Sequence, residues 1–321
     1  MTIGLRVAIC VPLHDEARNL PGLFRAIVAQ TEAPDILALL CDGCIDGSAA
    51  LARKLAANHP SLDVRIAEIP KHAFPHAGRA RAAALALGQA AIGGDGLLLT
   101  TDADTRPAAD WVASTRRALR TADLVCGRVT RRAAAGDPWR VAMETYLARL
   151  HNVRRAIDPV AHDPLPGHPH MGGASLALHA HVYRAVGGLP DLASGEDRAL
   201  VLAVRRAGFR VRHDPAVRVT TSDRVRGRAT GGLADALRDG RAAAIAGISA
   251  IVEHPEDAVA RYRMQAAARA AWRAGVDPAP SADAHVLLTV PDRPADSRPV
   301  PLAVAAALLT AYENSPESSA A

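Results

Sequence analysis

The chain has 321 residues, 49% of them apolar, and a formal net charge of +5. Length and composition are those of a globular protein of one or two domains. The arginines are scattered, and there is neither a basic tail nor an aromatic-rich segment, so we expect no nucleic-acid partner. No apolar run is long enough to cross a bilayer and the first residues do not form a signal peptide, so we expect a cytoplasmic protein without a transmembrane segment.

The first 130 residues alternate between strand-like and helix-like segments. We expect strands at 7–11, 36–41, 64–69, 97–101 and 124–129, and helices at 19–30, 46–58, 78–91 and 111–120. Such alternation predicts an α/β fold, in which helices cover both faces of a mixed, mostly parallel sheet.

The second half of the chain is less regular. We expect helices within 133–157, at 181–186 and at 196–207, strands at 174–178, 211–213 and 217–221, and mostly helix from about 232 to 274. Residues 278–300 are rich in proline, aspartate and serine, a composition that indicates a flexible segment. We therefore expect a domain at 1–225, with halves at 1–130 and 131–225, and a helical C-terminal extension at 226–321.

Two carboxylates, Asp102 and Asp104, directly follow the apolar strand predicted at 97–101. In open α/β sheets ligands bind at the carboxyl ends of the strands. Two aspartates at such an end can hold a hard divalent cation, which can in turn hold a diphosphate. The alternative is that they serve as turn formers or helix caps, as we expect of Asp110.

Cys41 and Cys44 form a Cys-x-x-Cys motif, which could indicate zinc or redox chemistry. No second such motif follows, and no histidine pair has the spacing of a zinc finger. Cys10 and Cys126 lie in apolar, strand-like runs and are expected to be small core residues. We therefore favour reduced thiols over a disulfide or a zinc site.

Five segments, taken in order, resemble motifs of the family-2 glycosyltransferases, which have the GT-A fold. They are residues 11–16, 42–48, 78–82, 102–104 and 186–208. The resemblance covers roughly residues 5–225. It implies an inverting, metal-dependent, hexosyltransferase-like enzyme that moves one sugar from a nucleoside-diphosphate sugar to an acceptor hydroxyl. The Gln-x-x-Arg-Trp motif of processive synthases is absent, so the resemblance favours a discrete acceptor.

The resemblance also implies a nucleotide-binding role for several residues of the first half. Pro12, Leu13 and Glu16 match the loop that wraps the nucleotide base, and Asp42 matches an aspartate that contacts the nucleoside. Cys41 stands where the family carries a second aspartate, which leaves the identity of the base open.

Basic and acidic motif residues complete the implied donor site. Arg79 matches a basic residue near the nucleotide, although it could equally be a solvent-facing arginine of an alanine-rich helix. Asp102 and Ala103 would contact the nucleotide sugar, and Asp102 and Asp104 would bind Mn²⁺ or Mg²⁺.

Glu196 and Asp197 match the acidic pair of the family's most specific block, which implies that Asp197 acts as the general base. The alternative is a helix N-terminus, where acidic residues are favoured by the helix dipole.

The acceptor site is less defined by the motifs. His168, His170, Gly172, Gly173 and Arg224 are candidates to line it, although a histidine-bearing surface loop is the alternative. An acceptor at a membrane surface and a homodimer are both compatible with the sequence.

Three other functions can be compared with sugar transfer. A catalytically silent nucleotide-binding protein of the same fold would explain Cys41. A sugar nucleotidyltransferase would carry a glycine-rich loop after the first strand, where this chain has Pro12 to Glu16 instead, and an NAD-dependent oxidoreductase would carry Gly-x-Gly-x-x-Gly there.

Overall fold

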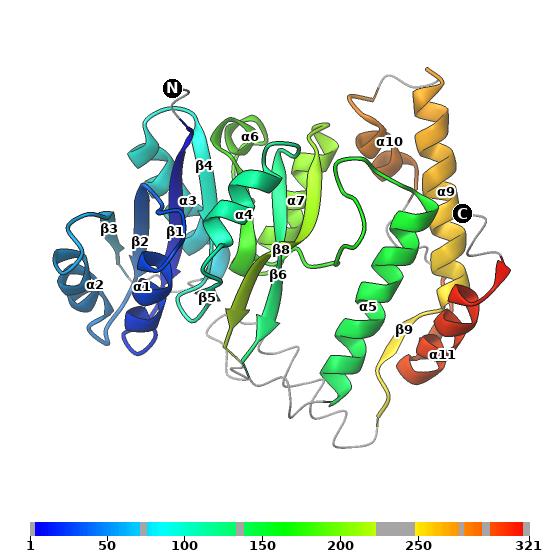
Figure 1. Cartoon of the computed structure of the whole chain (residues 1–321), viewed down its shortest axis with the longest axis horizontal. Coiled ribbons are helices and arrows are strands. Elements are labelled where there is room, and N and C mark those ends of the chain that lie inside the picture. Colours follow the sequence, from blue (N-terminus) through cyan, green and yellow to red (C-terminus); the bar gives the residue numbers. More distant parts are fainter. Residues whose placement is uncertain are drawn as a thin grey trace.

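The computed structural model describes residues 4–70, 76–132, 138–222, 248–275, 279–290 and 296–316. Its centre is an eight-stranded sheet with the strand order β3-β2-β1-β4-β7-β6-β8-β5 (Figure 1). The strands are β1 (Arg6–Leu13), β2 (Ile36–Asp42), β3 (Asp63–Ile69), β4 (Gly96–Thr100), β5 (Arg106–Pro107), β6 (Leu124–Arg131), β7 (Leu176–His179) and β8 (Val211–Thr221).

The sheet is mixed and mostly parallel, as predicted. Strand β1 pairs in parallel with β2 and β4, β2 pairs in parallel with β3, and β6 pairs in parallel with β8. Strand β7 is antiparallel to both β4 and β6, and the two-residue strand β5 is antiparallel to β8. The carboxyl ends of β1, β2, β4, β6 and β8 therefore lie at one edge of the sheet, which is where the motif residues follow their strands.

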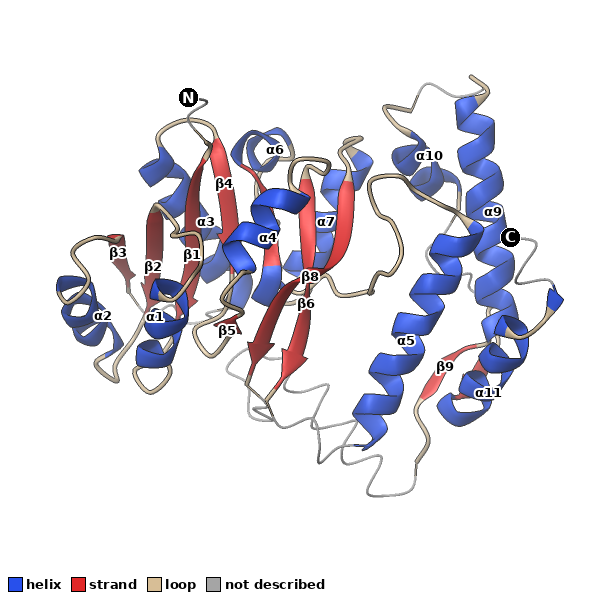
Figure 2. Cartoon of the chain, viewed as in Figure 1, coloured by secondary structure: helices blue, strands red, loops and turns tan. Residues whose placement is uncertain are grey.

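Helices cover both faces of this sheet, because successive strand residues point to opposite faces (Figure 2). In β1, Val7, Ile9 and Val11 pack toward α1, α2 and α4, whereas Ala8 and Cys10 pack toward α3, α6 and α7. The helices are α1 (Leu20–Val28), α2 (Ser48–Ala57), α3 (Ala77–Ile92), α4 (Trp111–Ala118), α6 (Ala180–Ala185) and α7 (Glu196–Arg206), and a 3-10 turn, η2, spans Gly173–Ser175.

A separate layer, made mostly of helices, lies beside the sheet and contains the long helix α5 together with the C-terminal elements (Figure 1). Tyr146 and Leu150 of α5 pack in one apolar cluster with Tyr262 of α9 and Leu309 of α11. The elements are α5 (Pro138–Ile157), β9 (Ile251–Glu253), α9 (Pro255–Arg273), α10 (Ala282–Thr289), β10 (Pro299–Pro301) and α11 (Leu302–Glu313).

A buried set of ion pairs joins this layer to the sheet domain. Arg269 of α9 donates two hydrogen bonds to Asp158, at 2.6 and 3.0 Å, and lies 2.7 Å from Asp283 of α10. Asp283 in turn faces Arg205 of α7 at 3.9 Å and His162 at 3.2 Å. Removal from water is the largest influence on Asp283, yet these partners hold its pKa well below the usual range.

The segment 278–300, expected to be flexible, contains helix α10 and the start of strand β10 among its described residues. Ser281 caps α10 by accepting a hydrogen bond from the backbone N–H of Ala284, and Asp283 is buried by its ion pairs. A composition of Pro, Asp and Ser thus supplies caps and buried partners here.

Two further differences concern strands. The two strands expected at 211–213 and 217–221 are the single strand β8, whose register with β6 shifts where Gly127 pairs with Asp214 and Arg128 with Arg218. The short strands β5, β9 and β10 were not expected. The helix expected from about 232 lies outside the described residues as far as 247, and none of the described helices is long and apolar enough to cross a membrane.

Candidate active site

A buried arginine, Arg81 of α3, lies among acidic side chains at the carboxyl end of β4. Its guanidinium donates hydrogen bonds to Asp102 at 3.0 Å and to Glu196 at 3.2 Å. It also donates to the hydroxyl of Thr100 and to the backbone carbonyl of Gly173, both at 3.0 Å. Four segments that are far apart in the sequence are thereby held together at one point.

The position of Arg81 around the axis of helix α3 explains why its side chain points toward the sheet. Ala84 and Leu85, three and four residues later, lie on the same helix face and are completely buried against the sheet. Gly173 leaves the space that the guanidinium needs, because a Cβ at that position would lie 2.3 Å from Cζ of Arg81. Burial opposes ionisation of Arg81, but Asp102, Glu196 and Asp197 outweigh it and raise its pKa.

Asp197 is oriented differently from its neighbour Glu196. Glu196 is buried against Arg81, whereas the half-buried Asp197 faces the loop before β7. Its Oδ2 accepts a hydrogen bond from the backbone N–H of Gly173 at 2.8 Å, and its Oδ1 accepts one from the N–H of Arg198 at 2.7 Å. A Cβ on Gly172 would lie 3.8 Å from Oδ2, so this glycine also borders the carboxylate.

The carboxylate of Asp104 is buried and held by the end of strand β8. It accepts hydrogen bonds from the hydroxyl of Thr221 at 3.4 Å and from that of Ser222. Its backbone carbonyl accepts a hydrogen bond from Arg132 at 2.8 Å. Because Thr221 ends β8, the hydroxyls fix Asp104 from the strand that lies beyond β7 and β6.

Asp102 lies near these groups, and 34% of its side chain is exposed. Removal from water raises its pKa, and the carboxylates of Asp104 and Asp197 raise it further, while Arg81 lowers it. Asp104 and Asp197 therefore both act electrostatically on Asp102, although 95 positions separate Asp102 from Asp197 in the sequence.

Asp102 and Asp104 offer carboxylate oxygens, which Mg²⁺ and Mn²⁺ prefer to nitrogen or sulfur. Among the described residues, these two aspartates and Asp197 do not form a group of three potential ligands at metal-binding distance, so the protein would supply a cation with one or two carboxylates here. The mutual repulsion that raises the pKa of Asp102 is the kind of interaction that a bound cation relieves.

The nucleotide-binding candidates lie at the neighbouring strand ends. Leu13 pairs with Cys41 between β1 and β2, so the loop after Pro12 and Leu13 lies beside Asp42. His14 Nδ1 lies 2.6 Å from the carbonyl oxygen of Asp42. The loop is fastened further where Asp15, which has a positive φ of 52°, accepts a hydrogen bond from the N–H of Ile45 at 2.7 Å.

Asp42 has one carboxylate oxygen without a protein partner. The side chain is buried, and within the described part of the chain its Oδ1 has no hydrogen-bond donor. Buried polar atoms are rarely left unpaired, so a ligand donor is expected at this point. Nearby, the buried Glu16 accepts a hydrogen bond from Asn19 at 2.6 Å, and its backbone N–H donates to Ser48 at 2.8 Å. Ala103, which lies between the two aspartates that follow β4, is also buried.

Arg79 is not part of the acidic cluster. Its side chain is exposed on the first turns of α3, whereas Arg81, two residues later, makes the buried contacts. The prediction that Arg79 lies near the nucleotide stays a prediction, and the motifs did not single out Arg81. The apolar stripe at Ala84 and Leu85 is the signal that could have identified Arg81.

The histidines of the loop before β7 line a hollow that β6 and α5 also border. His170 Nδ1 accepts a hydrogen bond from the backbone N–H of Val129 at 3.0 Å, and the ring of the buried His168 lies 5.0 Å from that of His170. The hollow has a volume of about 460 Å³. It is bordered by residues of β6, α5 and this loop, among them Arg128, Thr130, Thr145, Asn152, His168 and His170. Arg224 lies outside the described residues.

A second histidine cluster is buried between α5 and β8. Potential ligand atoms of His151, Asp163 and His213 lie within 4.8 Å of one another. They border a cavity of about 20 Å³, which is also lined by Arg154 and by two further arginines, Arg155 and Arg205. Three guanidinium groups oppose a cation at this place, and Asp163 is already bound to His213 at 3.2 Å. The cluster is better described as a packed polar junction.

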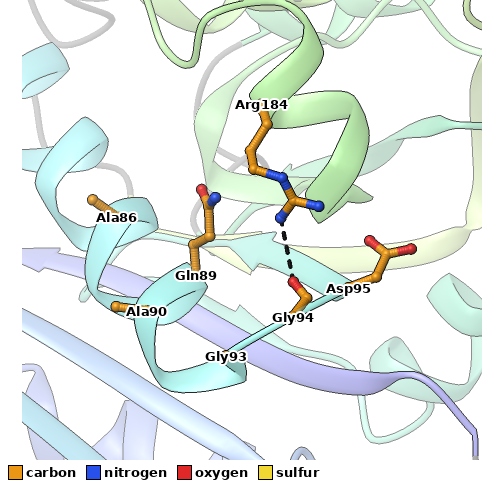
Figure 3. A pocket seen from close by; sticks show the side chains of 7 residues that line it. All are labelled: Ala86, Gln89, Ala90, Gly93, Gly94, Asp95 and Arg184. Atoms are coloured by element: carbon orange, nitrogen blue, oxygen red, sulfur yellow. Dashed lines mark hydrogen bonds between the residues drawn. The ribbon is translucent and has the colours of Figure 1, made fainter.

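Another hollow, of about 690 Å³, lies at the amino end of β4 (Figure 3). Its lining is mostly alanine and glycine, with Gln89, Asp95 and Arg184, and Arg184 donates to the carbonyl of Gly94 at 3.2 Å. Asp95 precedes β4 and Asp102 follows it, so this hollow is at the opposite end of the strand from the acidic cluster.

The model of the family described as glycosyl transferase family 2 matches residues 8–171, a little over half of the chain. The chain belongs to glycosyl transferase family 2. The matched part of this family-2 glycosyltransferase includes β1, β2, Arg81 and the pair of aspartates after β4, and it ends at the loop before Gly172.

Solved structures of glycosyltransferases share the fold. A mannosyltransferase from Pyrobaculum calidifontis, in complex with GDP-Man and Mn²⁺, is 19% identical with a TM-score of 0.54, over 99% of this chain and 79% of that one. TarS 1-349 from S. aureus, in complex with UDP-GlcNAc, is 13% identical with a TM-score of 0.51, over 70% and 60% of the two chains. The complex of the same protein with UDP is 12% identical with a TM-score of 0.50, over 84% of this chain and 72% of that one. At these identities the likeness concerns the GT-A fold, and no curated protein matches the sequence.

Proposed function

We propose that this family-2 glycosyltransferase moves one sugar from a nucleoside-diphosphate sugar to a hydroxyl of a discrete acceptor, with a divalent cation and with inversion. The observation that carries the proposal is that Asp102, Glu196 and Asp197 meet around Arg81 at the carboxyl end of β4, with Asp104 close enough to Asp102 to raise its pKa. Two proteins of similar fold support the donor class, since one is described with GDP-Man and Mn²⁺ and the other with UDP-GlcNAc.

The nucleoside would bind at the ends of β1 and β2. The unpartnered Oδ1 of Asp42 can accept a hydrogen bond from a base N–H or a ribose hydroxyl. The loop of Pro12, Leu13 and Glu16 is rigidly fastened beside it and would cover the base.

The diphosphate would lie beyond the end of β4. Asp102 and Asp104 would hold Mn²⁺ or Mg²⁺, which neutralises the charge that develops on the departing nucleoside diphosphate. Arg81 is saturated by protein partners, so its role is to position Asp102 and Glu196 rather than to grip a phosphate. Glu196, with its carboxylate turned to Arg81, is assigned the same supporting role.

Asp197 would act as the general base. Its two backbone hydrogen bonds fix the carboxylate at the rim of the cluster while leaving the side chain half-buried. As the acceptor oxygen bonds to the anomeric carbon, its proton passes to Asp197, and the bond from that carbon to the phosphate oxygen breaks. Attack opposite the leaving group inverts the anomeric centre, and base assistance of this kind contributes typically 10²–10⁴-fold.

The acceptor would enter from the side where His168 and His170 line the hollow. The loop that carries these histidines continues to Gly172 and Gly173, and the backbone N–H of Gly173 donates to Asp197.

We assign the transferase domain to 1–225, with a nucleotide half at 1–130, and the remaining residues to the extension. A cytoplasmic location, an acceptor at a membrane surface and a homodimer are retained as predictions from the sequence.

The proposal is tested by thermal shift with UDP, GDP, CDP and dTDP, each with and without Mn²⁺. Ligands that bind only the folded state raise its melting temperature. We expect one nucleotide to stabilise the protein, and to do so more strongly with Mn²⁺, followed by Mn²⁺-dependent hydrolysis of the matching nucleotide sugar. No shift with any nucleotide refutes the proposal, whereas tight binding without turnover indicates a silent binding protein. Release of pyrophosphate from a nucleoside triphosphate and a sugar phosphate would indicate a nucleotidyltransferase.

A further inference from the structure

Cys41 and Cys44 lie beside the proposed nucleotide site, three positions apart in the sequence. Cys41 is the second-last residue of β2 and is 1% exposed, while Cys44 lies after the bend at Gly43 and is partly exposed. Cys44 Sγ lies 3.4 Å from the carbonyl oxygen of Leu13, the residue that pairs with Cys41 between β1 and β2, and both cysteines pack in the same apolar cluster. Both cysteines are free in the structure.

We propose that Cys41 and Cys44 are a site of thiol–disulfide exchange, and that their disulfide weakens nucleotide binding at Asp42. The binding part of this inference rests on the proposed function, while the chemistry of the thiols does not. Asp42 and Gly43 are the two residues between the cysteines, so closing the bridge acts directly on the nucleoside-binding carboxylate.

The two thiols differ in the way that such an exchange requires. The hydrogen bond from Cys41 lowers the pKa of Cys44 and raises the pKa of Cys41. The accessible thiol is therefore the better thiolate, and the buried thiol is placed to resolve a mixed disulfide. Zinc is a poor alternative, because within the described residues no third metal-ligating side chain joins this pair.

The exchange needs an external disulfide such as oxidised glutathione. The Cys44 thiolate attacks one sulfur of that disulfide and expels one small thiolate, which leaves a mixed disulfide on Cys44. The Cys41 sulfur then attacks Cys44 Sγ, and the second small thiolate departs with the Cys41 proton. Two protein thiols are oxidised and one small disulfide is reduced to two thiols.

The disulfide would strain the residues that place Asp42. A disulfide would hold the two sulfurs about 2 Å apart, which draws residues 41 and 44 together. The bend between them is anchored on other strands, since the N–H of Gly43 donates to the carbonyl of Ile69 at 3.0 Å and the carbonyl of Asp42 lies 2.6 Å from His14. With those anchors fixed, the movement falls on the Asp42 side chain. Loss of one hydrogen bond to a carboxylate corresponds to about a tenfold loss of affinity.

The experiment treats the full-length protein with oxidised glutathione, blocks the remaining thiols with N-ethylmaleimide and maps the peptides by mass spectrometry. Cys10 and Cys126 are completely buried and serve as internal controls that should stay reduced. We expect a Cys41–Cys44 disulfide, a nucleotide dissociation constant about tenfold higher, and recovery of both after dithiothreitol.

Two variants separate the site from general oxidation. Cys44→Ser should form no disulfide and should bind nucleotide equally with and without the oxidant, whereas Cys126→Ala should respond like the original protein. The inference is overturned if peptide mapping finds no link between Cys41 and Cys44, or if the linked protein binds nucleotide within twofold of the reduced one. If the reduced protein binds no nucleotide at all, the proposed function and the effect on binding both fail, and the peptide map alone decides the disulfide.

Discussion

Replacing Arg81 with methionine is the sharpest test of how the site is built. The substitution keeps a long side chain on α3 but removes four hydrogen bonds, two of them to the carboxylates of Asp102 and Glu196. Glu196 is 5% exposed and would be left as a buried charge without its guanidinium partner.

The expected loss follows from that unpaired charge. Breaking a buried ion pair by removing one partner costs about 3–5 kcal/mol. Asp102 adds little, since a third of its side chain is exposed and water can solvate it. A loss of this size is a large part of the ~5–15 kcal/mol by which single domains are stable.

Urea unfolding followed by tryptophan fluorescence measures the change in the free energy of unfolding. Arg79→Met is the matched control, because it alters an exposed arginine two residues earlier on the same helix, and it should change stability by less than about 0.5 kcal/mol. The double variant Arg81→Met with Glu196→Gln should recover stability relative to Arg81→Met alone, because the unpaired charge is gone. If Arg81→Met lies within 1 kcal/mol of the original protein, on the scale of ordinary substitutions, or if Glu196→Gln makes it worse, the reasoning is refuted.

Four further outcomes are expected. Asp197→Asn should lower kcat by about 10²–10⁴-fold and leave the nucleotide Kd within about threefold, as steady-state kinetics and calorimetry would show. Asp104→Asn should weaken both Mn²⁺-dependent nucleotide binding and turnover. Gly173→Ala should destabilise by about 1–3 kcal/mol in urea, because its methyl group would collide with Arg81. Burial lowers the pKa of His151 to about 2, so its contribution to stability is complete above about pH 6.5 and is lost as the pH falls toward 2. Denaturation at several pH values should show that His151→Gln makes this loss shallower by up to about 1.4 kcal/mol per pH unit.

Each of these outcomes has a contrary result. Asp197→Asn with near-normal kcat would exclude Asp197 as the base. Asp104→Asn with unchanged binding would exclude a metal-assisted diphosphate site at that residue. A stable Gly173→Ala variant would mean that the loop yields to Arg81, and an unchanged pH profile for His151→Gln would mean that this ring takes up its proton in the folded state.

The elements that position the site could be predicted from the sequence, because each strand is a short apolar run with a polar residue at its end. All seven residues of β2 are buried and Asp42 is the last of them, while Asp102 comes two residues after the end of β4. Periodicity locates such strands well, since a buried strand tolerates few polar residues. The family motifs then placed the acids at the strand ends.

Side-chain direction on a helix was harder to predict from motifs. Arg79 and Arg81 differ by two positions, which turns them to different sides of α3. Only the spacing of each arginine from the buried Ala84 and Leu85 decides which of the two faces the sheet. The merging of two predicted strands into β8 had a similar cause, because the irregular stretch at Asp214 and Pro215 depends on pairing with β6, which is not local in the sequence.

The C-terminal layer was the part least accessible to prediction. Helix α10 begins in a region whose composition is typical of loops, and its Asp283 is stabilised by Arg205 and Arg269 from two other helices. Contacts between residues this far apart have no local signature. Composition alone therefore indicated a linker where the chain folds back on itself.

The ion pairs around Asp158 and Asp283 also determine how the protein can be handled and how it can evolve. Arg269, which neutralises both carboxylates, is contributed by the last quarter of the chain. A fragment ending near residue 225 would keep Asp158 enclosed by α5 while discarding its strongest partner. We therefore expect such a fragment to be recovered as insoluble material, and we expect the extension to have been inherited together with the catalytic sheet instead of being exchanged as a separate module.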